Sequence, residues 1–198
     1  MDASALPRAI ASARANGRRP IAVVASAGAS PTGNIDPLPA IADVCASEDL
    51  WLHVDGAHGA SLCLSDRYRN RLAGIERADS VVWDAHKVMA VPGLITAVLF
   101  RDGACSFQAF SQEASYLFKG ERPGWYDLGQ RNLECTKRMM SVTLHSVLAS
   151  LGPALLDDYV SRQVELAAAF AEMLEQSDDF DLTVAPDANI VCFRRRDT

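Results

Sequence analysis

The chain has 198 residues, of which 49% are hydrophobic and 22% charged, and its formal net charge is −6. A chain of this length can bury a core of its own, and the composition is typical of globular proteins. The acidic balance argues against nucleic acid as the main partner, because phosphate binding depends on an excess of lysine and arginine.

Hydrophobic strands alternate with helices over the first half of the chain. Runs such as residues 21–26 and 50–55 are apolar on both faces, which is typical of strands in a parallel sheet covered on both sides. We expect Asp36 to cap the helix after the first strand, with Pro37 in its first turn. In chain order, the expected elements are a helix at residues 3–16 that ends at Gly17, a strand at 21–26, a helix after Asp36, and strands at 50–55, 80–85 and 94–100.

The second half of the chain has a different character. Residues 111–132 are rich in glycine and charge and predict an exposed loop. Two helices are expected next, near residues 134–150 and 153–177, and two short strands, FDLTV and NIVCF, follow them. The predicted fold class is therefore α/β, with residues 1–150 in a sheet domain and residues 151–198 at the start of a smaller α+β domain.

Two further features of the sequence indicate the cellular location of the protein. The longest nearly apolar run, residues 88–100, is interrupted by Pro92 and Gly93, whereas a membrane-spanning helix needs about 20 apolar residues. The five cysteines are scattered and form no C-x-x-C pair, which is typical of reduced thiols rather than of disulfides or a zinc site. We therefore expect a cytoplasmic protein that has neither a membrane nor a nucleic acid as its partner.

Polar side chains gather just after the ends of the expected strands. In open α/β sheets ligands bind at the carboxyl ends of the strands, so these positions predict a binding site before any motif is considered. The residues concerned are Ser26, Ser30, Asp55, His58, Asp84, His86 and Lys87.

The stretch from His53 to His58 allows two kinds of site. His53, Asp55 and His58 are residue types that bind metal ions, and together they would provide three ligands. However, a histidine within a strand more commonly packs beneath the sheet, and a metal triad usually needs a further ligand of the right type. We therefore assign no metal site and consider an organic cofactor instead.

Asp55 and Lys87 together suit an aldehyde cofactor. Lys87 follows a hydrophobic strand and precedes an apolar stretch, and burial favours the neutral form of a lysine, which condenses with an aldehyde. Pyridoxal phosphate is the common protein-bound aldehyde, and a buried carboxylate stabilises the protonated form of its pyridine nitrogen. A buried salt bridge between Asp55 and Lys87 would also explain the pair, although not the surrounding sequence.

Three stretches around these residues, LWLHVDGAHGAS, GIERADSVVWDAHK and VPGLITAVLFRD, carry the motifs HVD-x-A, A-D-S and H-K in a specific order and spacing. They closely resemble the group II pyridoxal-phosphate-dependent amino-acid decarboxylases, which include the glutamate, aromatic amino-acid and diaminobutyrate enzymes. The resemblance covers about residues 2–196. It implies an aspartate aminotransferase-like fold (fold type I), of which the chain would hold the C-terminal part of the large domain and the start of the small domain.

The resemblance implies roles for several residues. Lys87 corresponds to the lysine that forms a Schiff base with pyridoxal 5'-phosphate, and His86 to the histidine that helps to hold the phosphate. Asp55 corresponds to the carboxylate that pairs with the pyridine nitrogen, and Ala57 to the small residue packed against the ring. Ser30 falls where relatives have a threonine near the cofactor, so a hydroxyl is kept there.

Tyr116 corresponds to a tyrosine at the start of a catalytic loop, which is implicated in protonating the substrate α-carbon, often across a dimer interface. Together the matches imply decarboxylation of an L-amino acid through a lysine Schiff base and a quinonoid intermediate. An aminotransferase-type enzyme would use Lys87 and Asp55 equally well. A non-catalytic chain that serves as an assembly partner is the other alternative.

The sequence departs from the family pattern at several positions. Many relatives have N-P-H-K where this chain has Asp84-Ala85-His86-Lys87. An ionised Asp84 would be repelled by a phosphate, so it either faces away or belongs to another arrangement. Ala29 replaces a threonine of the relatives. His58 replaces an aromatic or small residue, and it either contacts the substrate or is a hydrogen-bonded loop histidine.

The chain is also much shorter than the members of that family. The residue that stacks on the cofactor ring and the loop that supplies most phosphate donors would lie upstream of it. We therefore expect a fragment, a truncated reading frame or one half of a split enzyme. Its expected partners are an amino acid substrate and either a second copy in a homodimer or a complementing N-terminal half.

Overall fold

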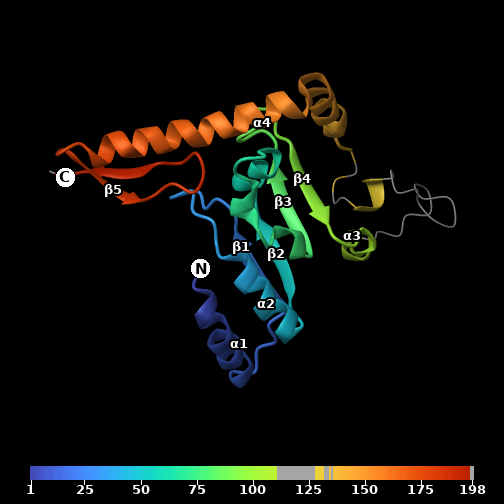
Figure 1. The fold of residues 1–198 in the computed structure, drawn as a ribbon. Coiled ribbons are helices and arrows are strands. Elements are labelled where there is room, and N and C mark those ends of the chain that lie inside the picture. Colours follow the sequence, from blue (N-terminus) through green and yellow to red (C-terminus); the bar gives the residue numbers. More distant parts are fainter. Residues whose placement is uncertain (111–127, 132–133, 135, 197–198) are drawn as a thin grey trace.

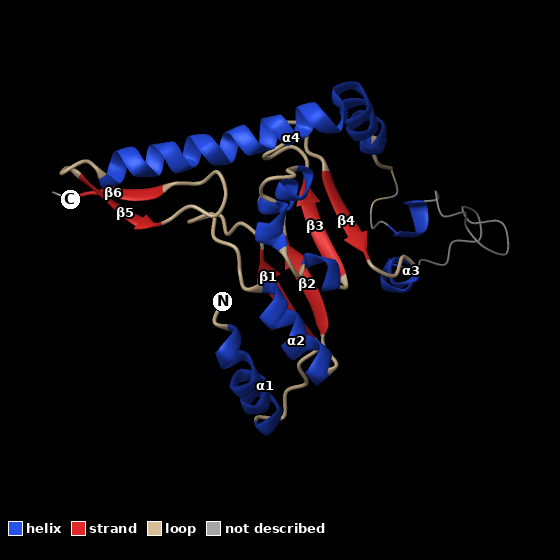
Figure 2. Ribbon diagram, in the orientation of Figure 1, coloured by secondary structure: helices blue, strands red, loops and turns tan. Residues whose placement is uncertain are grey.

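The central feature of the fold is a four-stranded sheet with the strand order β1-β2-β3-β4 (Figure 1, Figure 2). The computed structural model describes residues 1–110, 128–131, 134 and 136–196. β1, β2 and β3 run parallel, and β4 runs antiparallel beside β3. The mainly parallel sheet predicted from the sequence is therefore confirmed. The strands are β1 (Ala22–Ser26), β2 (Trp51–Asp55), β3 (Ser80–Asp84) and β4 (Thr96–Phe100).

The direction of β4 follows from the connection that precedes it. Parallel neighbours need a long crossover, usually a helix, whereas residues 85–95 form turns that send the chain straight back beside β3. Ala90 and Gly93 adopt positive φ values of 50° and 88° within this connection. The antiparallel return places Thr96 of β4 directly opposite Asp84 of β3.

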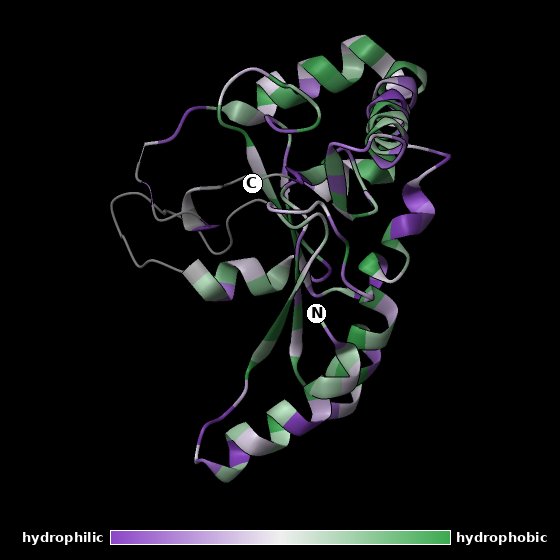
Figure 3. Ribbon diagram, turned by 90° about the vertical axis from the view of Figure 1, so that its left-hand side faces the viewer, coloured by the Kyte–Doolittle hydropathy of each residue, from purple (hydrophilic) through white to green (hydrophobic). Residues whose placement is uncertain are grey.

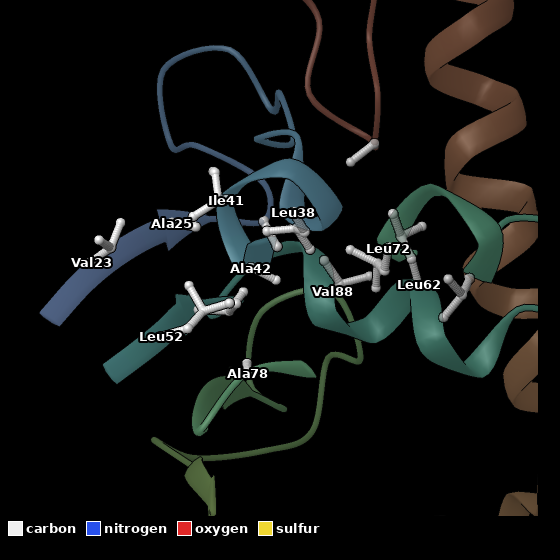
Figure 4. Packing of buried hydrophobic residues seen from close by; sticks show 14 of the residues in the cluster. Val23, Ala25, Leu38, Ile41, Ala42, Leu52, Leu62, Leu72, Ala78 and Val88 are labelled. Carbon is white, nitrogen blue, oxygen red and sulfur yellow. The ribbon is translucent and has the colours of Figure 1, made fainter. Parts of the chain in front are cut away.

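One face of the sheet is covered by α2 (Leu38–Glu48). Successive side chains of a strand point to opposite faces, so every second strand residue contributes to this side. Figure 4 shows strand side chains facing the apolar side of α2. The residues buried between the strands and the helix are Val23, Ala25, Leu52 and Val54 from β1 and β2, and Leu38, Ile41, Ala42 and Cys45 from α2.

The first predicted helix is confirmed, but the predicted cap of α2 is wrong. α1 (Leu6–Ala15) follows a short 3-10 turn, and Gly17 adopts a φ of 70° just after it ends. The carboxylate of Asp36 accepts a hydrogen bond from the amide of Ser26 at 2.7 Å and pairs with the N-terminal amine of Met1. Because both contacts hold the carboxylate near the end of β1, it makes no capping bond to α2.

The other face of the sheet is open in the described part of the chain. Val24 in β1 and Val98 in β4 are 56% and 53% exposed, although both are apolar strand residues. The register places His53 and Asp55 of β2 on the same face as these two valines. Figure 3 shows that hydrophobic residues dominate the strands. The sequence predicted a sheet that is covered on both faces. Among the described residues, only the face that packs against α2 is covered.

Helices and a hairpin make up the described part of the second half of the chain. β2 and β3 are joined by short 3-10 turns, one of which is Gly59–Leu64. The predicted loop at residues 111–132 falls mostly outside the described residues. The elements after β4 are α3 (Ala104–Phe110), a 3-10 turn at Leu128–Arg131, α4 (Met140–Glu175), β5 (Phe180–Val184) and β6 (Cys192–Arg195).

α4 is interrupted close to the predicted domain boundary. Gly152 has a non-helical backbone, with φ of 72° and ψ of 166°, and Pro153 follows it. α4 therefore consists of two helical stretches, as predicted, although the first begins at Met140 rather than near residue 134. The C-terminal stretch lies beside the β5–β6 hairpin (Figure 1). The domain boundary near residue 150 stays a prediction.

The last strand begins later than predicted. NIVCF starts at Asn189, but β6 starts at Cys192. Ala188 is buried in the core, and the side chain of Asn189 is hydrogen-bonded to His58 and Gln163. This segment therefore packs against the sheet region, and the pairing with β5 begins only after it. None of the helices described is both long and apolar enough to cross a membrane.

Candidate active site

The strand register brings two carboxylates to the same edge and face of the sheet. Asp55, the last residue of β2, is paired with Val82 of β3, and Asp84 ends β3 two residues later. Residues two apart in a strand point to the same face, so Asp55 and Asp84 both lie on the open face at the carboxyl ends of adjacent parallel strands. This edge is where ligands bind in open α/β sheets.

Lys87 approaches Asp84 from the turn that follows β3. Its Nζ lies 2.9 Å from Oδ2 of Asp84, and the hydroxyl of Thr96 donates a hydrogen bond to Oδ1 at 2.6 Å. Burial raises the pKa of the Asp84 carboxyl, but the hydrogen bonds from Thr96 and Lys87 outweigh burial, so this pKa lies below its ordinary value. The result is an ionised, buried carboxylate next to the amine that the sequence predicted to be reactive.

His86 lies between this ion pair and the start of β4. Its Nδ1 lies 2.9 Å from the carbonyl oxygen of Ile95 and 3.1 Å from the amide nitrogen of the same residue. Its Nε2 lies 3.9 Å from Oδ2 of Asp84. The backbone of Ile95 therefore fixes the ring through Nδ1, and the other ring nitrogen is left on the side of the carboxylate.

Asp55 is the exposed carboxylate of the site. Its Oδ1 accepts a hydrogen bond from the amide of Ala57 at 3.1 Å, which ties the side chain to its own loop. The carbonyl of Ala57 accepts a hydrogen bond from the amide of Asp84 at 3.2 Å. The loop after β2 is thereby joined to the end of β3, so Ala57 lies between the two carboxylate positions.

The loops after β1 and β2 are packed with their backbones in contact. The amide of Gly59 donates to the carbonyl of Ala27 at 2.9 Å. A Cβ added at Gly59 would lie 2.5 Å from that oxygen, and one added at Gly28 would lie 2.8 Å from the nitrogen of Gly59. Gly28 also has a φ of 92°, which favours glycine. This close approach fixes the loop that carries Ala57 beside the loop that follows β1.

Ser30 lies in the loop that follows β1, and its side chain is exposed. The far end of this loop is tied to the connection between β5 and β6, because the side chain of Asn34 and the amide of Ile35 both donate to Asp187. The structure thus brings Lys87, His86 and Asp84 together, with Asp55 and Ala57 on the next strand end and Ser30 one loop further away. Tyr116 lies outside the described residues.

The two histidines of the HVDGAH stretch have separate partners. Nδ1 of His53 lies 2.7 Å from the hydroxyl of Ser80, which also accepts a hydrogen bond from Trp51. Nε2 of His58 lies 2.6 Å from Oδ1 of Asn189. Of the two alternatives for His58, this contact favours the hydrogen-bonded loop histidine. The described residues contain no group of three or more His, Cys, Asp or Glu side chains that would hold a metal ion.

Lys87 has a salt-bridge partner that the sequence did not indicate. The alternative explanation of its charge was a pair with Asp55, whereas the observed pair is with Asp84. The spacing of three residues between Asp84 and Lys87 was the available signal. Thr96 gave no signal, because its contact depends on the direction of β4.

Residues 1–196 match the conserved domain of the pyridoxal-dependent decarboxylases. The chain belongs to this family. The resemblance that the HVD-x-A, A-D-S and H-K motifs indicated is therefore confirmed.

Members of this pyridoxal-dependent decarboxylase family share both the sequence and the fold. The chain is 36% identical to the cysteine sulfinic acid decarboxylase of Homo sapiens over 193 residues, which cover 95% of this chain and 39% of that protein. Its structure resembles that of mouse CSAD in the apo form, with a TM-score of 0.90, 32% identity, and coverage of 98% of this chain and 41% of that one. Oryza sativa TDC with PLP and tryptamine gives a TM-score of 0.90, 28% identity, and coverage of 99% and 40%.

These similarities confirm the predicted fold class. The mainly parallel sheet and its helices correspond to part of the large domain of the aspartate aminotransferase-like fold, fold type I. The chain spans about two fifths of the length of the relatives that it matches.

Proposed function

We propose that the chain carries the lysine and the carboxylate of a pyridoxal-phosphate-dependent amino-acid decarboxylase site. The observation that carries this proposal is the placement of Asp55 at the carboxyl end of β2 and of the Lys87 amine, from the turn after β3, against Asp84 on the same open face. Membership of the decarboxylase family supports carbon dioxide release as the reaction, in preference to transamination.

The side chains at this edge of the sheet fit pyridoxal phosphate. Lys87 has a primary amine that would anchor the aldehyde covalently, and the exposed carboxylate of Asp55 would pair with the pyridine nitrogen. Ala57 has a side chain small enough to leave space for a flat ring between the two. When bound, pyridoxal phosphate supplies an electron sink for the carbanion that remains after carbon dioxide leaves.

The remaining proposed roles concern orientation and protons. His86, fixed through Nδ1 by the backbone of Ile95, would offer Nε2 to the phosphate group. Ser30 would offer a hydroxyl near the cofactor. We assign Tyr116 the return of a proton to the substrate α-carbon. Asp55, held by the amide of Ala57, would place its carboxylate at the ring nitrogen.

The rest of the site would come from another stretch of polypeptide. We propose either a second copy of the chain in a homodimer or a complementing N-terminal half, together with an amino acid as substrate. The length of the relatives and the exposure of Val24 and Val98 on the open face support a covering segment there. We propose a cytoplasmic location because the four described cysteines are free.

Cofactor uptake by the purified chain tests the proposed anchor. Pyridoxal phosphate should give an absorbance band at the edge of the visible range, and borohydride reduction should fix the label on Lys87, as peptide mapping by mass spectrometry would show. Lys87→Ala should abolish both signals. Lys137→Ala, which removes an exposed lysine paired with Glu134, should leave them unchanged. Identical spectra of the wild type and Lys87→Ala would contradict the assignment.

The products formed from a panel of L-amino acids test the reaction type. The panel includes cysteine sulfinic acid, because that compound appears in the name of a relative. Carbon dioxide is the expected product of the assembled protein, and an oxo acid in its place would contradict the decarboxylase proposal.

A further inference from the structure

Asp84 is a carboxylate that the sheet holds in place against the amine of Lys87. It ends β3 directly opposite Thr96 of β4, and the side chains of an opposed pair point to the same face. Nζ of Lys87 lies 2.9 Å from Oδ2 of the carboxylate, whereas the hydroxyl of Thr96 donates a hydrogen bond to Oδ1 at 2.6 Å. Because each oxygen has its own partner, Thr96 orients the carboxylate without competing for the amine.

The two partners of the ion pair differ in their freedom to move. The exposed fraction is 10% for the Asp84 side chain and 39% for the Lys87 side chain. The carboxylate belongs to a strand, whereas Lys87 has a long flexible stem that starts from a turn. The amine is therefore able to leave the ion pair while the carboxylate keeps its position.

We propose that Asp84, oriented by Thr96, is the resting ion-pair partner of the Lys87 amine. It holds the amine as an ammonium ion whenever the lysine is not bonded to a carbonyl carbon. This inference rests on the proposed function of Lys87. An ammonium ion has no lone pair, so the amine must give up a proton before it attacks an aldehyde. Asp84 would thus be a positioning residue that restrains the free amine and receives it again after a substrate displaces it.

The other charged groups near Asp84 fit this role. His86 is the other titratable side chain close to the carboxylate, with Nε2 3.9 Å from Oδ2, and Asp55 faces the same side from the neighbouring strand. Burial raises the pKa of Asp84, but hydrogen bonds from Thr96 and Lys87 outweigh it and lower the pKa. The carboxylate is consequently ionised at neutral pH. An ammonium ion finds a full negative charge there.

Trace labelling with acetic anhydride measures how much neutral amine each lysine presents, and it needs no cofactor. Lys137, which is paired with Glu134, serves as the internal reference. Asp84→Asn keeps an oxygen for Thr96 but removes the charge. Labelling of Lys87 relative to Lys137 near pH 8 should then rise by roughly two- to fivefold, because the amine is no longer held by an opposite charge. Equal labelling ratios in the wild type and Asp84→Asn would overturn the proposal.

Two further variants separate the role of the charge from general effects on folding. Asp66→Asn removes an exposed ion pair with Arg69 at 3.2 Å, which has the same three-residue spacing, and it should leave the Lys87 ratio unchanged. Thr96→Val removes the donor to Oδ1 and should raise the ratio by a smaller factor. If Asp84→Asn fails to fold, an unchanged ratio in Thr96→Val overturns the proposal.

The experiments distinguish an error in the proposed role of Asp84 from an error in the proposed function of Lys87. If borohydride does not fix pyridoxal phosphate on Lys87 of the wild type, the proposed anchor is wrong, whatever the labelling ratios show. If the cofactor is fixed on Lys87 but the labelling ratio of Lys87 to Lys137 does not respond to Asp84→Asn or Thr96→Val, only the proposed role of Asp84 is wrong.

Discussion

At the scale of single residues, the charge of Asp84 connects the site to acid stability. Burial raises the pKa of this carboxyl, yet the hydrogen bonds from Thr96 and Lys87 outweigh burial, so the pKa in the folded protein lies below the usual 3.8. A lowered pKa means that the ionised form stabilises the folded state fully at pH values above about 3.8. This contribution is lost as the pH falls from there through the pKa of the folded protein.

We predict that Asp84→Asn lowers the free energy of unfolding by about 1–2 kcal/mol at neutral pH, because hydrogen bonds to a charged group are strong but Lys87 is partly exposed and screened. The difference between the wild type and the variant should shrink below about pH 4. Urea unfolding at a series of pH values measures both effects. A difference that does not change with pH would assign the loss to packing instead of charge.

The sequence predicted the positions of the site residues better than their contacts. Asp55 ends one apolar run and Lys87 follows another, which places both near the carboxyl ends of strands, but the shared face of Asp55 and Asp84 depends on the register between β2 and β3. The partner of Lys87 depends on the turn after β3, and the contact of Thr96 depends on the direction of β4. His58 was undecided for a similar reason, since its bond to Asn189 joins residues 131 positions apart. The role of Tyr116 stays a prediction.

At the scale of elements, the backbone contact between the loops after β1 and β2 explains two glycines. A Cβ at Gly59 would lie 2.5 Å from the carbonyl oxygen of Ala27, so either loop would have to move. Backbone atoms on both sides leave no flexible side chain to give way. The loop that carries Ala57 is therefore expected to shift with any side chain larger than hydrogen at position 59.

We predict that Gly59→Ala lowers the free energy of unfolding by roughly 2–4 kcal/mol, since overpacking against backbone forces a displacement. Gly103→Ala is the matched control, because a Cβ there meets nothing within 4 Å, and it should change stability by less than about 0.5 kcal/mol. Chemical denaturation of the three proteins measures the effect. Similar losses in both variants would show that the close approach of the loops does not determine stability.

The elements themselves were predictable where a hydrophobic run decides them. β1, β2, β3 and β4 all lie within the predicted hydrophobic runs. The details that failed depend on partners from elsewhere in the chain. Asp36 does not cap α2 because Ser26 and Met1 bind its carboxylate, and β6 starts late because Asn189 is bonded to His58 and Gln163.

At the scale of the whole molecule, the sequence could not distinguish the covered face of the sheet from the open one. Val23 is buried and Val24 is 56% exposed, although the two residues are identical in type. Apolar residues on both faces predict covering on both sides, and the described chain provides it on one. The difference is consistent with the proposed homodimer or complementing half.

The C-terminal part of α4 contributes to the same buried cluster as the sheet region. Val160 and Val164, which lie after the predicted boundary at residue 150, are buried in this cluster together with Leu62 and Val88. Small domains with one shared core usually unfold in a single cooperative transition. The sheet region and the C-terminal helix are therefore expected to lose their structure together.

We predict that Val160→Ala lowers the free energy of unfolding by roughly 2–3 kcal/mol, because it removes two methyl groups from a fully buried site. Fluorescence of Trp51 and Trp83, in a Trp125→Phe background, reports on the sheet, and far-ultraviolet circular dichroism reports mainly on the helices. Both urea midpoints should fall together. Val142→Ala, at a 54% exposed position of α4, should leave both nearly unchanged. A shift in the dichroism midpoint alone would show that residues after the boundary unfold as an independent unit.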